Sequence, residues 1–136
     1  MKKFIFMLIA SVALMSIGVL QAQVVQFAKT ASNPTGAFVD GGSDTVYLTV
    51  NQSFVKAGIQ PVATKVSGTL AGTATLQGSI DGVNFVTIGS AFTLTNVAKS
   101  TTIWTVDYGP YSRYRVIFTG SGTMSATGSA FFLGRR

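Results

Sequence analysis

The chain has 136 residues, carries ten lysines and arginines against four acidic residues, and has a net charge of +6. It contains no histidine, cysteine or glutamate, which removes the commonest general base and the thiolate and imidazole ligands of metal sites. The acidic residues are Asp40, Asp44, Asp81 and Asp107. Their spacing does not indicate a paired-carboxylate centre. We therefore predict that the chain is not an enzyme and holds no cofactor or metal.

The N-terminus has the three-part pattern of a secretory signal. A basic start with Lys2 and Lys3 precedes an apolar run over residues 4–20, and the small residue Ala22 follows. This pattern predicts an apolar helix and cleavage between Ala22 and Gln23. The run is at the short edge of the roughly 20 residues that cross a bilayer, so a retained anchor and an uncleaved packed segment are the alternatives. Contact with a membrane is expected only through residues 4–20, if they are not removed.

Within residues 23–44, the stretch from Val24 to Gly36 alternates weakly between apolar and polar side chains and contains Asn33-Pro34, which is typical of an arm or an edge strand. Residues 23–44 end in a loop rich in aspartate and glycine at residues 40–44. Two carboxylates and a hydroxyl are too few to specify a Ca²⁺ site, so we interpret this stretch as an ordinary loop. The predicted division is thus a signal-like segment over 1–22, an arm and loop over 23–44, and a folded domain over 45–136.

From residue 45 onward the dominant period is two, the pattern of half-buried strands. One face of the third predicted strand should carry Ala74, Leu76 and Ile80. A hairpin is indicated where Asp81-Gly82 follows Ile80, because glycine accepts the positive φ of a tight turn. The predicted strands cover residues 45–50, 62–70, 73–80, 85–88, 92–97, 103–108, 113–118 and 124–132. No segment keeps a period of 3.6. Seven to eight short strands predict an all-β fold, an antiparallel β-sandwich or a jelly-roll-like one, preceded by the N-terminal apolar helix.

Four side chains are candidates for contact with a partner or ligand: Tyr47, Tyr111, Arg113 and Arg115. The alternation places both arginines on one face of their strand and Tyr114 on the other. A nucleic-acid patch would need the tyrosine ring beside the arginines for base stacking, so no nucleic acid is expected as a partner.

Two stretches carry a resemblance to a known class. Residues 64–86, TKVSGTLAGTATLQGSIDGVNFV, and residues 114–123, YRVIFTGSGT, resemble small Gly/Thr-rich β-sandwich structural proteins of tailed bacteriophages. The resemblance spans roughly residues 45–133. It implies a non-catalytic virion component, capsid-associated or part of the head–tail or tail structure. Such a component works through self-association and contacts with other virion proteins.

The alternative is an exported bacterial surface or periplasmic binding module for a carbohydrate or a cell-surface partner. Exposed Tyr47, Tyr111 or Trp104 would support this function, although Trp104 shares an apolar face with Val106 and so favours the core. Virion proteins assemble in the cytoplasm, whereas the signal-like segment indicates export to the periplasm or beyond. The fate of residues 1–22 therefore divides the two hypotheses.

Overall fold

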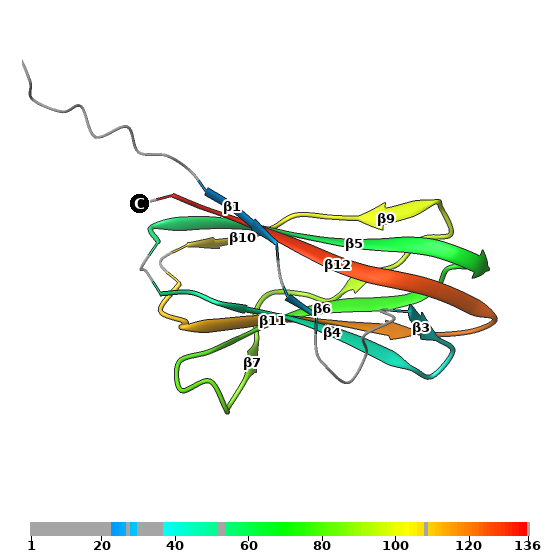
Figure 1. Ribbon diagram of the computed structural model, residues 1–136, viewed down its shortest axis with the longest axis horizontal. Coiled ribbons are helices and arrows are strands. Elements are labelled where there is room, and N and C mark those ends of the chain that lie inside the picture. The colour runs from blue at the N-terminus through cyan, green and yellow to red at the C-terminus, as the bar shows by residue number, and fades with distance from the viewer. Residues whose placement is uncertain (1–22, 27, 30–36, 52–53, 108, 136) are drawn as a thin grey trace, which may run out of the picture.

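The protein is a sandwich of two antiparallel β-sheets, as Figure 1 shows for the computed structural model. The structure describes residues 23–26, 28–29, 37–51, 54–107 and 109–135, and side chains from residue 37 onward. This part of the chain forms twelve strands and no helix. The predicted all-β antiparallel sandwich is confirmed. The expected N-terminal helix, Ala22 and the alternatives for residues 4–20 lie outside the described residues.

One sheet, sheet A, is built around two long strands that pair along their whole length. β5 (Lys56–Gly68) lies beside β12 (Met124–Arg135), with one register shift between Ser125 and Ala126. The order across the sheet is β1-β12-β5-β10, with β3 also paired to β12 and β9 to β5. The shorter strands are β1 (Gln23–Gln26), β3 (Ala37–Val39), β9 (Lys99–Thr101) and β10 (Trp104–Asp107).

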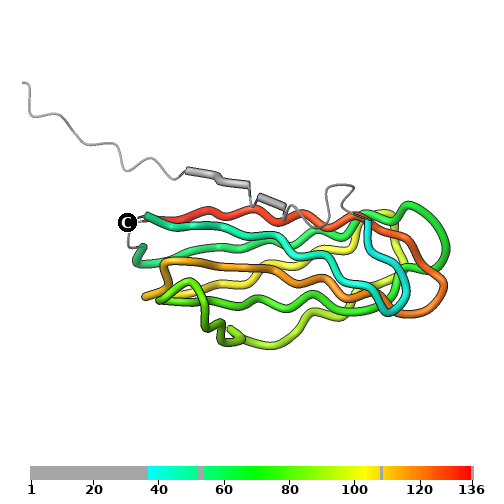
Figure 2. The backbone as a smooth tube through the Cα atoms, turned by 60° about the horizontal axis from the view of Figure 1, so that its bottom comes forward, coloured from blue at the N-terminus to red at the C-terminus, as the bar shows by residue number. Residues whose placement is uncertain are grey.

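The second sheet, sheet B, has the order β2-β4-β11-β6-β7, and β8 also pairs with β6. Its centre is β11 (Arg113–Gly120), which pairs with β4 (Ser43–Thr49) on one side and β6 (Gly72–Ser79) on the other. The edges are formed by β2 (Ala28–Lys29), β7 (Val86–Thr87) and β8 (Phe92–Thr93). The tube in Figure 2 shows these strands running lengthwise along the molecule.

The structure has more strands than the predicted seven to eight, because several strands are very short and because the strand beside β5 is divided into β9 and β10. β9 and β10 pair with β5 in the same register, with Val62 opposite Thr101 and Ile59 opposite Trp104. Pro61 falls between these pairs and has no N–H to donate, so the ladder breaks there. Its carbonyl still accepts a hydrogen bond of 2.7 Å from the Thr101 hydroxyl.

Residues 23–44, expected as an arm or edge strand, supply β1 to β3 and the first residues of β4. β1 and β3 pair with β12 in sheet A, whereas β2 pairs with β4 in sheet B. The described part of this segment therefore contributes to both sheets. The division into domains at residue 44 stays a prediction.

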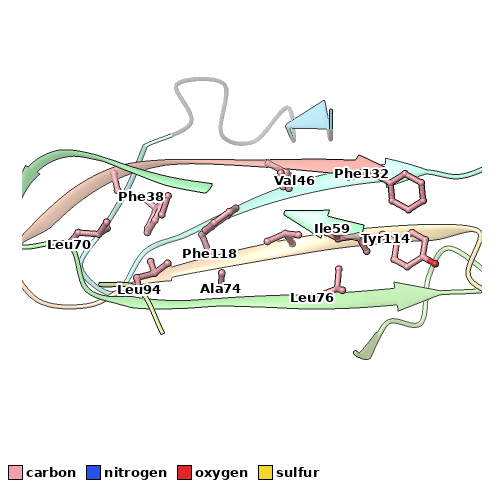
Figure 3. Packing of buried hydrophobic residues seen from close by; sticks show 14 of the residues in the cluster. Phe38, Val46, Ile59, Leu70, Ala74, Leu76, Leu94, Tyr114, Phe118 and Phe132 are labelled. Carbon is pink, nitrogen blue, oxygen red and sulfur yellow. The ribbon is translucent and has the colours of Figure 1, made fainter. Parts of the chain in front are cut away.

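The core lies between the inner faces of the two sheets, where Figure 3 shows the aromatic rings meeting. Phe38 and Phe118 stack with ring centroids 5.7 Å apart. Gly128 makes room for Phe118: a Cβ at residue 128 would lie 2.5 Å from the ring. A Cβ at Gly78 would likewise lie 2.6 Å from the ring of Tyr111. Glycines on the inner faces thus create the space that this thin sandwich needs for its large rings.

Candidate contact surface on the outer face of sheet B

The outer face of sheet B brings together polar and aromatic side chains from three neighbouring strands. Arg115 on β11 stands opposite both Tyr47 on β4 and Gln77 on β6. These three residues alternate with buried ones along their strands, so their side chains share the solvent-facing side of the sheet. They form one row across the sheet.

Phe85, from the hairpin between β6 and β7, completes a cluster over this row. The guanidinium carbon of Arg115 lies 4.1 Å from the centroid of the Phe85 ring, which is a cation–π contact. The ring of Tyr47 meets the same phenyl ring edge-on, with centroids 6.2 Å apart. Arg115 Nε also donates a hydrogen bond of 2.7 Å to Gln77 Oε1. We call Tyr47, Gln77, Phe85 and Arg115 the aromatic–arginine cluster.

The hairpin that carries Phe85 is ordered by Asp81. The backbone N–H groups of Val83 and Asn84 donate to Asp81 Oδ1 at 2.9 and 2.8 Å, and the Ser79 hydroxyl donates to it at 2.8 Å. The Asn84 side chain donates to Oδ2 at 2.7 Å. The Val83 backbone bond, followed by the bonds from Asn84 and Ser79, holds the pKa of Asp81 well below its usual range. Gly82 turns the chain with a φ of +78°, as the Asp-Gly signal predicted.

Arg113 lies one row further along β11 and is exposed. Its side chain packs on Gly82, and Nη1 donates a long hydrogen bond of 3.4 Å to the Gly82 carbonyl. Within the part of the chain that the structure describes, the ion pair is between Lys56 and Asp107 on sheet A, at 3.5 Å. Neither Arg113 nor Arg115 has a carboxylate partner among those described residues. Two guanidinium groups thus stand on one face with no ion pair to any carboxylate of the described residues.

Exposed apolar side chains lie on the hairpin whose Gly82 packs against Arg113. Ile80 is 68 %, Val83 78 % and Val86 54 % exposed, and all three belong to the same hairpin. The expectation that Ile80 shares the buried face of Ala74 and Leu76 is wrong, because β6 ends at Ser79 and the turn carries Ile80 outward. A hairpin with exposed apolar side chains beside two arginines, Arg113 and Arg115, has the composition of a contact surface.

The structure places the four predicted contact residues on different faces. Tyr47, Arg113 and Arg115 lie on the outer face of sheet B. Tyr111 instead packs against the core, edge-on to Tyr114 at 5.7 Å, in the space that Gly78 leaves. Burial, and secondarily the neighbouring Tyr111, raises the pKa of Tyr114.

Trp104, named for the exported alternative, is half-buried and packs against the core. Its indole N–H donates to the Ser90 carbonyl at 3.2 Å.

Sequence reasoning missed Phe85 and Gln77 as members of the cluster. The available signal was the Asp-Gly turn, because a tight hairpin after β6 returns the chain beside β6 and brings Phe85 close to its outer face.

The loop at residues 40–44 separates its two carboxylates. Asp40 Oδ1 accepts a hydrogen bond of 2.8 Å from the Gly122 N–H, whereas Asp44 is buried at 1 % exposure. Among the described residues, no three potential ligands gather as a metal site would require. The described residues also contain no helix long and apolar enough to span a membrane.

No family model and no curated protein matches this sequence. Among solved structures, the chain is similar to the CBM36-1 domain of a multidomain xylanase from the hindgut metagenome of Trinervitermes trinervoides. That match has 17 % identity and a TM-score of 0.48 over 84 % of this chain and 97 % of the domain. The enzymatically active domain of bacteriophage CBA120 tailspike protein 4 matches with 9 % identity and a TM-score of 0.47, over 85 % and 18 % of the two chains. A structure of infectious bursal disease virus, Gx strain, matches with 13 % identity and a TM-score of 0.46, over 85 % and 32 %. These similarities assign no ligand or partner to this chain.

Proposed function

We propose that this protein is a non-catalytic module that works by docking the outer face of sheet B on a macromolecular partner. The observation that carries the proposal is the aromatic–arginine cluster beside Arg113, with two cations lacking acidic partners among the described residues. Tyrosine, phenylalanine and arginine are enriched where proteins make energetically important contacts. The cluster is also pre-ordered by its own contacts, which lowers the entropy lost on binding.

In the leading form of the proposal, the module is a bacteriophage virion component, capsid-associated or part of the head–tail or tail structure. The Gly/Thr-rich hairpins of residues 64–86 and 114–123 support this form through their resemblance to phage structural proteins. The outer edge of β4 also supports it, because described strand β2 pairs there with only Val46 and Tyr47. A sheet edge with few charges favours strand-to-strand association with further copies or other proteins.

The second form is an exported surface or periplasmic binding module. It is favoured by the signal-like segment at residues 4–20 and by the cations on the docking face, which suit an acidic surface outside the cell.

The N-terminal sequence of the native protein separates the two forms. We expect an intact Met1 in protein recovered from particles if the virion form is correct, and an N-terminus at Gln23 if the exported form is correct. Size-exclusion chromatography and electron microscopy of the purified protein test assembly directly. A monomer that joins no particle and no cell surface would contradict the proposal in both forms.

A further inference from the structure

Arg113 and Arg115 point to the chemistry of the partner. We propose that this pair binds the carboxylates of an acidic polysaccharide that lies across the outer face of sheet B. The inference rests on the proposed function, because it names the ligand class of the same docking face.

The spacing of the two arginines suits a polymer with repeated charges. They are two residues apart on β11, with the buried Tyr114 between them, so both side chains leave the sheet on the same side. Two residues of a strand span about 7 Å. A linear chain bearing carboxylates at regular intervals engages both cations at once, and the second contact then forms at a high effective concentration.

Both guanidinium groups are held in place before any ligand arrives. Arg115 is fixed by Gln77 Oε1 at 2.7 Å and by the Phe85 ring, and Arg113 packs on Gly82. A guanidinium has five N–H donors. The hydrogen bonds described use the Nε–H of Arg115 and one Nη1 bond of Arg113. The remaining N–H donors can bind a carboxylate through two parallel hydrogen bonds, the bidentate geometry that arginine prefers.

The surroundings of the pair favour a sugar polymer over a nucleic acid. Hydroxyl groups line the same face: Thr45 and Thr49 on β4 and Thr75 on β6 alternate with buried residues and so face outward. Hydroxyls and the Gln77 amide can exchange hydrogen bonds with sugar hydroxyls. Only two described cations stand on this face, whereas nucleic-acid binding draws its affinity from the neutralisation of many phosphates.

The test uses protein purified from cells that express the 136-residue sequence. The probe is polygalacturonate, with fully methyl-esterified polygalacturonate as the uncharged counterpart of the same backbone. Binding is measured by isothermal titration at about 50 mM salt, where exposed charges are weakly screened. We expect polygalacturonate to bind at least tenfold more tightly than the ester.

Matched variants separate a specific contact from general attraction. Arg113→Gln should weaken polygalacturonate binding about tenfold, the typical consequence of losing a hydrogen bond to a charged group. Arg135→Gln changes the net charge equally but lies at the end of β12 in sheet A, and should change binding less than twofold. Arg113 is exposed, so its replacement should leave the melting temperature unchanged.

Several results would overturn the inference. These are no binding of polygalacturonate, equally tight binding of the ester, or equal effects of Arg113→Gln and Arg135→Gln. Loss of polygalacturonate binding in Val83→Ser, with none in Arg113→Gln, would show that the arginine does not make the contact and would also overturn it. If the inference fails while the docking face is buried in the native assembly, the ligand class is wrong and the proposed function stands.

Discussion

Gly128 offers the sharpest test of how this sandwich is packed. The residue lies on the inner face of β12, beneath the fully buried ring of Phe118. A Cβ built on it would lie 2.5 Å from Cδ2 and 2.8 Å from Cε2 of that ring, whereas ordinary carbon contacts are 3.4–4 Å. The ring would have to move by about 1 Å, and its stacking on Phe38 opposes that movement.

Gly128→Ala should therefore destabilise the protein. Overpacking of a core typically costs about 1–3 kcal/mol, and replacing glycine returns about 0.4–1 kcal/mol by restricting the unfolded chain. We expect a net loss of about 1–2 kcal/mol, which corresponds to a fall of roughly 4–8 °C in melting temperature for a domain of this size. The single tryptophan, Trp104, reports unfolding in urea by its fluorescence.

Gly58→Ala is the matched control. Gly58 is also a strand glycine, but a Cβ there would meet only Ile103, at 4.0 Å. This variant should be as stable as the wild type or more stable by up to about 1 kcal/mol. Phe118→Leu should shrink the penalty of Gly128→Ala in a double-mutant cycle. If Gly128→Ala is as stable as Gly58→Ala, the close packing of Phe118 on Gly128 is refuted.

Two further predictions concern the titration of Asp81 and Tyr114, and a third concerns a partly buried hydrogen bond of Asn96. The fold depresses the pKa of Asp81, so this carboxylate contributes stability at pH values above its unfolded pKa of about 4. That stability is lost as the pH falls toward the folded pKa. Asp81→Asn should therefore flatten this part of the acid unfolding profile. The raised pKa of Tyr114 contributes stability at pH values below its unfolded pKa of about 10, and this stability is lost as the pH rises through the folded pKa. Tyr114→Phe should therefore flatten the dependence of stability on alkaline pH, measured by urea unfolding. Asn96 Oδ1 accepts a 3.0 Å hydrogen bond from the backbone N–H of buried Leu70. Asn96→Ala should cost about 1 kcal/mol in urea unfolding, whereas Asn96→Asp keeps an acceptor and should lose less; equal losses would contradict this role.

Much of the fold follows from local alternation in the sequence. The period of two correctly predicted the strands around Val46, Leu76, Val116 and Ala126, because a sheet with one buried face imposes that period on its residues. It missed the first half of β5, because the predicted strand began at Val62 whereas β5 begins at Lys56. The structure accommodates Pro61 by interrupting the neighbouring strand between β9 and β10.

The contact surface was only partly predictable. Alternation placed Arg113 and Arg115 on the outer face, since faces are a local property of a strand. It could not show that Gly78 opens a space for Tyr111 inside the sandwich, or that Phe85 folds back over Arg115. Both depend on contacts between residues far apart in the sequence, which alternation alone does not specify.

Hydroxyl-radical footprinting of the native protein tests the docking face most directly. The labelling of Tyr47, Phe85 and Val83 would be compared between purified protein and protein in its native particle or cell envelope. The references are exposed Val66 on β5 of sheet A and exposed Ile103, which lies between β9 and β10. We predict that the outer face of sheet B is protected in the native setting while the references label as before. Unchanged labelling of Tyr47, Phe85 and Val83 there would contradict the account.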